Sequence, residues 1–211
     1  MSLINYILIF IIWFIWSFQH SFFAQVYFKN KIRIYLGENF EKYFYRFLYF
    51  YIQCVIFPIF WNILTEFDGG NIIYSLNEDY FWILFIINKI SFLLLIWSVI
   101  SINTLHFIGL SQLIQFFDKK EKFNMVLPNE ELEKKFLYKF VRHPMYFSIF
   151  LYYMSHTVTY DEKYFFNFFC LILYTNIGVY FEEKQLSKKF GSLYDEYKKQ
   201  VPKLIPKIKI I

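Results

Sequence analysis

The chain has 211 residues, of which 57% are hydrophobic and 26% aromatic, while only 18% are charged. A soluble domain of this length lacks the interior to bury so many apolar side chains. The composition therefore excludes an ordinary water-soluble globular protein. The net charge of +5 then has to be interpreted together with the positions of the apolar segments.

Uninterrupted apolar segments predict five membrane-spanning helices in a single all-α domain that covers residues 1–211. A helix needs about 20 apolar residues, with about 17 as the lower limit, to cross the hydrocarbon layer. The third segment is broken only by Lys89, and the fourth is the shortest, although aromatic ends extend it. The expected spans are residues 3–19, 47–64, 80–105, 145–160 and 164–181.

The first span is expected to be retained in the mature protein. The opening residues read MSLINYILIF, with no basic region before the apolar run and no small-residue cleavage site after it. Two cysteines, Cys54 and Cys170, fall in the middle of spans. Burial in a bilayer makes them structural thiols, and no disulfide framework is expected.

The basic residues predict the orientation of the spans. Five Lys or Arg residues lie between Phe28 and Arg46, seven between Ile108 and Pro144, and eight after Phe181. The other two connections hold none and one. By the positive-inside rule, the N-terminus lies outside, and both long connections and the C-terminus lie in the cytoplasm. The net charge is therefore an orientation signal, and no nucleic-acid partner is expected.

Polar residues from four spans are expected to converge at the cytoplasmic leaflet. They are Gln19, His20 and Ser21 after the first span, Asn103, Thr104, His106 and Gln112 after the third, Arg142 and His143 before the fourth, and Glu182 and Glu183 after the fifth. Ionisable residues at membrane depth are functional candidates. Each one alone could instead reach to lipid headgroups, pack in the core or begin a solvated helix. Their convergence favours a polar cavity that opens to the cytoplasm.

Two cytoplasmic helices are expected beside this cavity. The segment after Glu182 repeats apolar residues at helical spacing, with lysines opposite, which predicts one amphipathic helix that contains Gly191 and ends at Pro202. Before the fourth span, the sequence LPNEELEKKFLYKF predicts a short helix capped by Asn129. That helix would bring Tyr138 beside His143.

Several of these segments resemble a known family. The sequence LYKFVRHPMY, a hairpin of two spans and then EEKQLSKKFGSLYDEYKKQVPKLIP resemble the C-terminal signature of the membrane methyltransferases related to isoprenylcysteine carboxyl methyltransferase. Upstream, FQHSFFAQVYFK and SINTLHFIGLSQL are similar to segments of the methanethiol S-methyltransferase and NnrU-like branch. Asn103 departs from that branch by one position, since the chain reads NTLHF and not NHF.

The resemblance implies a five-span enzyme of the bilayer that uses S-adenosylmethionine. Carried over from the family, the cofactor-binding residues are Leu132, Tyr138, Arg142, His143, Pro144, Met145, Tyr146, Glu182 and Glu183. The first glutamate would pair with the ammonium group, the aromatic rings would stack or face the sulfonium, and the arginine would orient the loop or the carboxylate of the methionine moiety.

The resemblance also implies a small lipophilic substrate, a thiol such as methanethiol, that reaches the pocket through the lipid bilayer. The candidate catalytic residues are His20, His106 and Glu182. A thiol must lose its proton before it attacks, and a neutral histidine is a suitable base. Tyr180 stands where the thiol-methylating branch has an arginine, and this difference leaves the identity of the methyl acceptor open.

Other functions compete with this interpretation. Within the superfamily, the acceptor could be a prenylated cysteine carboxylate or a lipid amine. A non-catalytic NnrU-like component is another possibility, and a nicotinamide nucleotide is a remote one. A membrane haem or metal protein would use His20, His106 and His143. Three single histidines on three spans are a weaker signal than clustered ligands, so no metal site is predicted.

Overall fold

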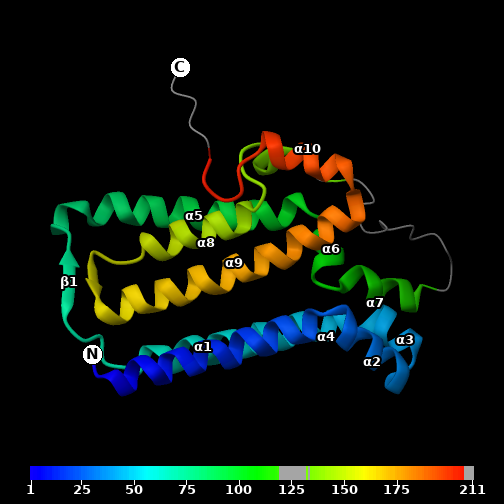
Figure 1. Ribbon diagram of the computed structural model, residues 1–211, viewed down its shortest axis with the longest axis horizontal. Coiled ribbons are helices and arrows are strands. Elements are labelled where there is room, and N and C mark those ends of the chain that lie inside the picture. Colours follow the sequence, from blue (N-terminus) through cyan, green and yellow to red (C-terminus); the bar gives the residue numbers. More distant parts are fainter. Residues whose placement is uncertain (119–131, 133, 207–211) are drawn as a thin grey trace. The chain divides into compact units, whose positions relative to one another are not determined.

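The computed structural model of the protein describes residues 1–118, 132 and 134–206. It comprises two compact units, whose helices are labelled in Figure 1. Unit 1 contains the described residues of Met1–Gly70 and Asn103–Pro128, and unit 2 those of Asn71–Ile102 and Asn129–Ile211. Helices form nearly all of the regular structure in both units.

Unit 1 is built around two long helices. The α1 helix (Leu3–Ala24) begins at Ser2, whose side chain caps it by accepting a hydrogen bond from a backbone N–H. Its Trp13 packs edge-on against Phe60 of α4, with 5.0 Å between ring centroids. The remaining elements are α2 (Val26–Leu36), α3 (Glu38–Phe40), the π-helical η1 (Glu41–Tyr45), α4 (Arg46–Thr65), α6 (Thr104–Phe107) and α7 (Leu110–Phe117).

A glycine fixes the turn between α6 and α7 against α4. Gly109 has a φ of 82°, in the left-handed region, and a Cβ atom at this position would lie 2.3 Å from the backbone nitrogen of Phe47. Such a distance is impossible for a side chain, so only glycine allows this close approach. The contact keeps α6 beside the first turn of α4.

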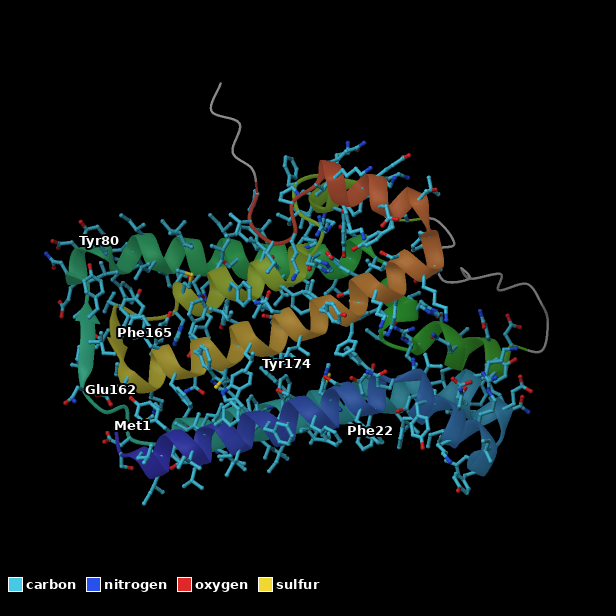
Figure 2. The ribbon with its side chains drawn as sticks, viewed as in Figure 1. Met1, Phe22, Tyr80, Glu162, Phe165 and Tyr174 are labelled. Atoms are coloured by element: carbon cyan, nitrogen blue, oxygen red, sulfur yellow. The ribbon has the colours of Figure 1, made fainter. Side chains whose placement is uncertain are left out.

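Unit 2 combines a short sheet with a helical hairpin. Its elements are β1 (Ile72–Ser75), η2 (Glu78–Tyr80), α5 (Phe81–Ser101), η3 (Phe136–Lys139), α8 (Pro144–Met154), β2 (Thr159–Asp161), α9 (Glu162–Phe190) and α10 (Ser192–Gln200). The two strands pair antiparallel, with Ile72 opposite Asp161 and Ser75 opposite Thr159. In Figure 2, Tyr80 and Glu162 mark the end of unit 2 that carries this sheet.

Small polar residues line the contact between α5 and α8. Ser91 and Ser98 of α5 and Ser148 of α8 are buried, and each donates its hydroxyl to a carbonyl of its own helix. Asn88 adds a hydrogen bond from its side-chain amide to the Tyr152 carbonyl. Small residues at helix interfaces are typical of membrane bundles, because they let two backbones approach closely.

Four helical segments are long and apolar enough to cross a membrane: Leu3–Ala24, Glu38–Thr65, Glu78–Ser101 and Glu162–Phe190. Large apolar side chains cover their exteriors, for example Trp82, Leu93 and Ile100 on α5. These four segments confirm the prediction of an all-α membrane protein. The fifth span, expected over residues 145–160, stays a prediction. Its helix, α8, has 11 residues, which span about 16 Å of a hydrocarbon layer that is about 30 Å thick.

Several helices end at other residues than expected, because local hydrogen bonds stop them. The third span was expected to reach residue 105, but α5 ends at Ser101, because Asn103 caps a new helix by accepting from the backbone N–H of His106. The helix of the fourth predicted span, α8, ends at Met154, and the hydroxyl of the next residue, Ser155, donates to the carbonyls of Leu151 and Tyr152.

The expected amphipathic tail helix is divided in two. The α9 helix runs without interruption from Glu162 to Phe190 and therefore includes Glu182 and Glu183. Gly191, which was predicted to lie inside a helix, has a φ of 55° and forms the C-cap of α9. The segment Ser192–Gln200 is a separate helix, α10. Asn129, the predicted cap of the helix before the fourth span, lies outside the described residues.

The close approach at Gly109 predicts a large effect of substitution. Gly109→Ala should cost about 1–2 kcal/mol for the left-handed backbone, and the clash with α4 should add to that cost. Gly37→Ala is the comparison without a clash, because Gly37 also has a positive φ, although with a ψ of 158°, and no atom lies within 4 Å of the added Cβ. Thermal unfolding in detergent should show a clearly lower melting temperature for Gly109→Ala than for Gly37→Ala, and equal losses would contradict the packing role.

Candidate functional site

The Arg142–His143–Pro144 segment starts α8 in a fixed geometry. Proline is favoured at the first position of a helix, and the residue before it is excluded from the helical region. The backbone N–H groups of Arg142 and His143 are then turned away from α8. They donate to the carbonyls of Pro202 and Lys203, at 2.9 and 3.2 Å. The segment after α10 is therefore fastened to the start of α8.

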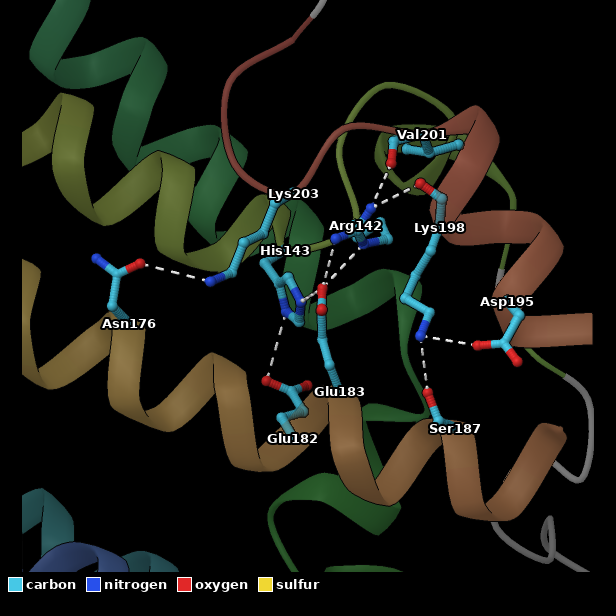
Figure 3. Close-up of polar contacts among 10 residues, drawn as sticks. All are labelled: Arg142, His143, Asn176, Glu182, Glu183, Ser187, Asp195, Lys198, Val201 and Lys203. Carbon is cyan, nitrogen blue, oxygen red and sulfur yellow. Dashed lines mark hydrogen bonds and ion pairs between the residues drawn. The ribbon is translucent and has the colours of Figure 1, made fainter. Parts of the chain in front are cut away.

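The guanidinium of Arg142 connects three elements of unit 2 (Figure 3). Its Nε and Nη2 atoms lie 2.9 and 2.8 Å from Oε1 of Glu183 on α9. Its Nη1 donates to the carbonyls of Lys198 and Val201, at 3.1 and 2.7 Å. These carbonyls belong to the C-terminal end of α10, where unpaired acceptors and the helix dipole favour a cation. Arg142 thus joins the start of α8 to α9 and α10.

His143 lies between the two glutamates. Its ring is buried, with Nε2 3.1 Å from Oε1 of Glu183 and Nδ1 3.4 Å from Oε2 of Glu182. The two carboxylates differ in their surroundings. The Glu183 side chain is 19% exposed and also pairs with Arg142, whereas that of Glu182 is 47% exposed. Glu182 therefore has capacity for a further cation, whereas Glu183 is already paired with Arg142 and His143.

The other predicted cofactor residues flank this cluster in different ways. The ring of Tyr146 is tilted against that of His143, with 5.9 Å between centroids, and its hydroxyl would lie 3.7 Å from a Cβ at Gly178 of α9. Pro144 is buried, and Met145 is half-buried beside it. Tyr138 accepts a hydrogen bond at its carbonyl from the Tyr197 hydroxyl. Leu132 is half-buried and not in a helix.

The two candidate bases belong to unit 1. His20 of α1 packs against Trp16 and Tyr49, with ring centroids 5.4 and 5.8 Å away, and its carbonyl accepts from the Tyr49 hydroxyl. The side-chain amides of Gln19 and Gln53, on α1 and α4, are buried without a hydrogen-bond partner in the described part of the chain. Buried amides of this kind indicate room for a polar group or water in unit 1.

His106 is held more tightly than His20. Its Nε2 lies 3.1 Å from Nη1 of Arg46, and its Nδ1 lies 2.9 Å from the side-chain nitrogen of Gln112. A guanidinium can only donate, so the lone pair of Nε2 is already used. His106 therefore orients Arg46 and the α6–α7 turn, and it is a poorer proton acceptor than an imidazole with a free lone pair.

Sequence reasoning missed three residues with defined roles. Arg46 was counted only as a positive charge at a membrane boundary, yet it contacts His106 and the carbonyl of Phe107. Tyr194 belongs to the apolar repeat after Glu182, yet its buried hydroxyl has no hydrogen-bond partner among the described residues. Lys198 bridges Asp195 and Ser187 and thereby joins α10 to α9. Of these contacts, only the ion pair of Lys198 with Asp195 could be expected from a sequence pattern, because the two residues are three positions apart.

The arrangement in unit 2 suits a charged ligand. It combines an exposed carboxylate, a buried imidazole and aromatic rings on a frame fixed by an ion pair. Within the described residues, no three His, Cys, Asp or Glu side chains are grouped so that they could hold a metal ion. The chemistry that this cluster offers is therefore hydrogen bonding and charge pairing.

Comparisons with known proteins agree with this chemistry. The profile of the isoprenylcysteine carboxyl methyltransferase family matches residues 82–188, just over half of the chain. Over 197 residues, the chain is 26% identical to the methanethiol S-methyltransferase of Crocosphaera subtropica (strain ATCC 51142 / BH68), an alignment that covers 91% of this chain and 71% of the relative. No solved structure matches the chain. The chain therefore belongs to the isoprenylcysteine carboxyl methyltransferase family and is a membrane methyltransferase.

Proposed function

We propose that the protein transfers a methyl group from S-adenosylmethionine to a small thiol such as methanethiol, which gives dimethyl sulfide. The observation that carries the proposal is the difference between the two glutamates of unit 2. Glu183 is paired with Arg142 and His143, while Glu182 beside it is half-exposed. The name of the Crocosphaera relative supports the thiol acceptor.

The residues of unit 2 fit the charged end of this methyl donor. S-adenosylmethionine supplies a methyl group on a cationic sulfonium, and its aminoacyl end carries an ammonium and a carboxylate. The carboxylate of Glu182 suits the ammonium, and such a charge-assisted hydrogen bond is stronger than a neutral one. The rings of Tyr138 and Tyr146 suit the adenine or the sulfonium. Pro144, Met145 and Leu132 supply apolar lining.

Arg142 and Glu183 are better suited to a framework role than to direct contact with the donor. Four N–H groups of Arg142 already face Glu183, Lys198 and Val201. We therefore assign Arg142 to orienting the loop, and the methionine carboxylate must find its donors elsewhere.

His20 is the better candidate for the base that takes the thiol proton. The Nε2 atom of His106 already accepts from Arg46, so His106 is the poorer base, and we assign this role to His20 of the same unit. The buried amides of Gln19 and Gln53 support a polar recess for an acceptor in the same unit. A general base contributes about 10²–10⁴-fold to a rate.

We further propose five crossings, with the N-terminus outside and α10 an amphipathic helix on the cytoplasmic side. Cysteines introduced at Asn71 and Asp118, in a background without Cys54 and Cys170, should differ in reactivity. A membrane-impermeant maleimide added to intact cells should label Asn71→Cys and not Asp118→Cys, because basic connections stay in the cytoplasm. Labelling of Asp118→Cys from outside would contradict the orientation.

Glu182→Gln and Glu183→Gln should separate ligand binding from stability. Loss of a charge-assisted bond at Glu182 should weaken the binding of S-adenosylmethionine about ten- to a hundredfold, with little change in melting temperature. Glu183→Gln removes the partner of Arg142 and should instead cost about 1–3 kcal/mol of stability. Calorimetry and thermal unfolding measure the two effects, and small, equal effects at both positions would show that Glu182 does not bind the donor.

His20→Ala should lower the rate of thiol methylation about 10²–10⁴-fold while cofactor binding stays intact. The loss should shrink as the pH rises toward the pKa of the thiol, because solution then supplies the thiolate. The rate is measured by headspace detection of dimethyl sulfide. His156→Ala, a histidine at the other end of the fourth predicted span, is the control and should behave like the wild type. A His20→Ala enzyme with full activity would remove this residue from the mechanism.

A further inference from the structure

Tyr194 of α10 has a hydroxyl that is buried without a partner. The residue is 1% exposed, and its oxygen has no hydrogen-bond partner within the part of the chain that the structure describes. Leaving a buried polar group unpaired costs stability, so native proteins rarely keep one without a reason. A phenylalanine would fill the same space at no such cost. The hydroxyl therefore needs a partner that the described residues do not supply.

The ring of Tyr194 is fixed in place from several sides. Lys198 places its Nζ 5.4 Å from the centre of the ring and also bridges Ser187 of α9 and Asp195. The ring of Tyr197 lies 5.9 Å away. The end of α10 is held by the Arg142 guanidinium. Because Tyr194 is buried and the C-terminal part of its helix is held in place, its hydroxyl is not placed to turn outward to water.

The surroundings of this hydroxyl are those of the polar cluster. Burial raises the pKa of Tyr194, the carboxylate of Glu183 raises it further, and the nearby Arg142 lowers it. Glu182 adds a smaller raising effect. The phenol therefore stays protonated, and it lies within electrostatic range of the residues that surround His143. It can donate one hydrogen bond and accept others.

We propose that the Tyr194 hydroxyl binds the aminoacyl end of the methyl donor, beside the Glu182 carboxylate. This assignment rests on the proposed function. The aminoacyl end carries a carboxylate that needs donors, and Arg142 is already committed to Glu183 and to two carbonyls of α10. A neutral phenol within electrostatic range of two glutamates can supply such a donor without adding a charge. Adenine is a less suitable partner, because the buried ring of Tyr194 offers no free face for stacking.

The proposal predicts an unusual combination of effects for Tyr194→Phe. The ligand-free variant should be as stable as the wild type or more stable, because an unpaired buried hydroxyl has been removed. Its affinity for S-adenosylhomocysteine, the demethylated product, should fall about ten- to a hundredfold. Its affinity for 5′-methylthioadenosine, which lacks the aminoacyl group, should not change. A residue with only a structural role would not discriminate between these two ligands.

Tyr153→Phe is the matched control. Tyr153 lies at the opposite end of α8 from His143, and its hydroxyl donates to the carbonyl of Tyr164 at 3.1 Å. This variant should lose stability and keep both affinities. Calorimetry gives the affinities, and thermal unfolding gives the stabilities.

The outcomes separate this proposal from the proposed function. Wild-type protein that binds neither ligand would overturn both. Wild-type protein that binds S-adenosylhomocysteine, together with a Tyr194→Phe variant that binds it equally well, would overturn only the role of Tyr194. A Tyr194→Phe variant that loses both ligands equally would show that the hydroxyl does not contact the aminoacyl end, and would overturn the proposal as well.

Discussion

The pairing of the Glu183 carboxylate with Arg142 and His143 is the interaction on which the site in unit 2 depends. One oxygen of Glu183 lies within 3.1 Å of nitrogens from both residues. A carboxylate in a largely buried position is costly unless it is paired. Its pairing also orients Arg142, which then donates to the carbonyls at the end of α10. One ion pair thus fixes the start of α8, the end of the apolar part of α9 and the position of α10. The positions of His143, Glu182 and Tyr194 follow from it.

The helices of this fold could be predicted from sequence because each depends on a long apolar run. Four of the five predicted segments correspond to helices of sufficient length and apolarity to cross a membrane. The ends of the helices were harder to predict, because each depends on a single side chain and its local backbone. Asn103 ends one helix by capping the next, and Gly191 ends α9 through a positive φ. Hydrophobic patterning contains neither signal, and the apolar spacing around Gly191 fits one continuous helix equally well.

The site was predictable as a set of residues but not as a set of roles. The family resemblance identified Arg142, His143, Glu182 and Glu183, and the structure brings these four together. The sequence does not show that Arg142 bonds to Glu183, because the two residues are 41 positions apart and no sequence pattern indicates that contact. Arg142 and the two glutamates were therefore all assigned to the cofactor, although contacts already occupy Arg142 and Glu183. The sequence also does not show that the hydroxyl of Tyr194 is buried without a partner among the described residues, because Tyr194 belongs to an apolar pattern.

The adjacency of the two glutamates matches the shape of His143. An imidazole carries its nitrogens on different sides of one small ring, so carboxylates from consecutive residues of one facing helix can flank it. Consecutive helical residues differ by about 1.5 Å in height and about 100° in direction. Glu183 can then turn toward Arg142, while Glu182 turns toward the more exposed side.

A neutral imidazole donates from only one nitrogen, so a His143 ring that donates to Glu183 presents a lone pair toward Glu182. An ammonium group bound there would donate to both the lone pair and the carboxylate. Arg142 keeps Glu183 in place, so Glu183 does not compete for that cation.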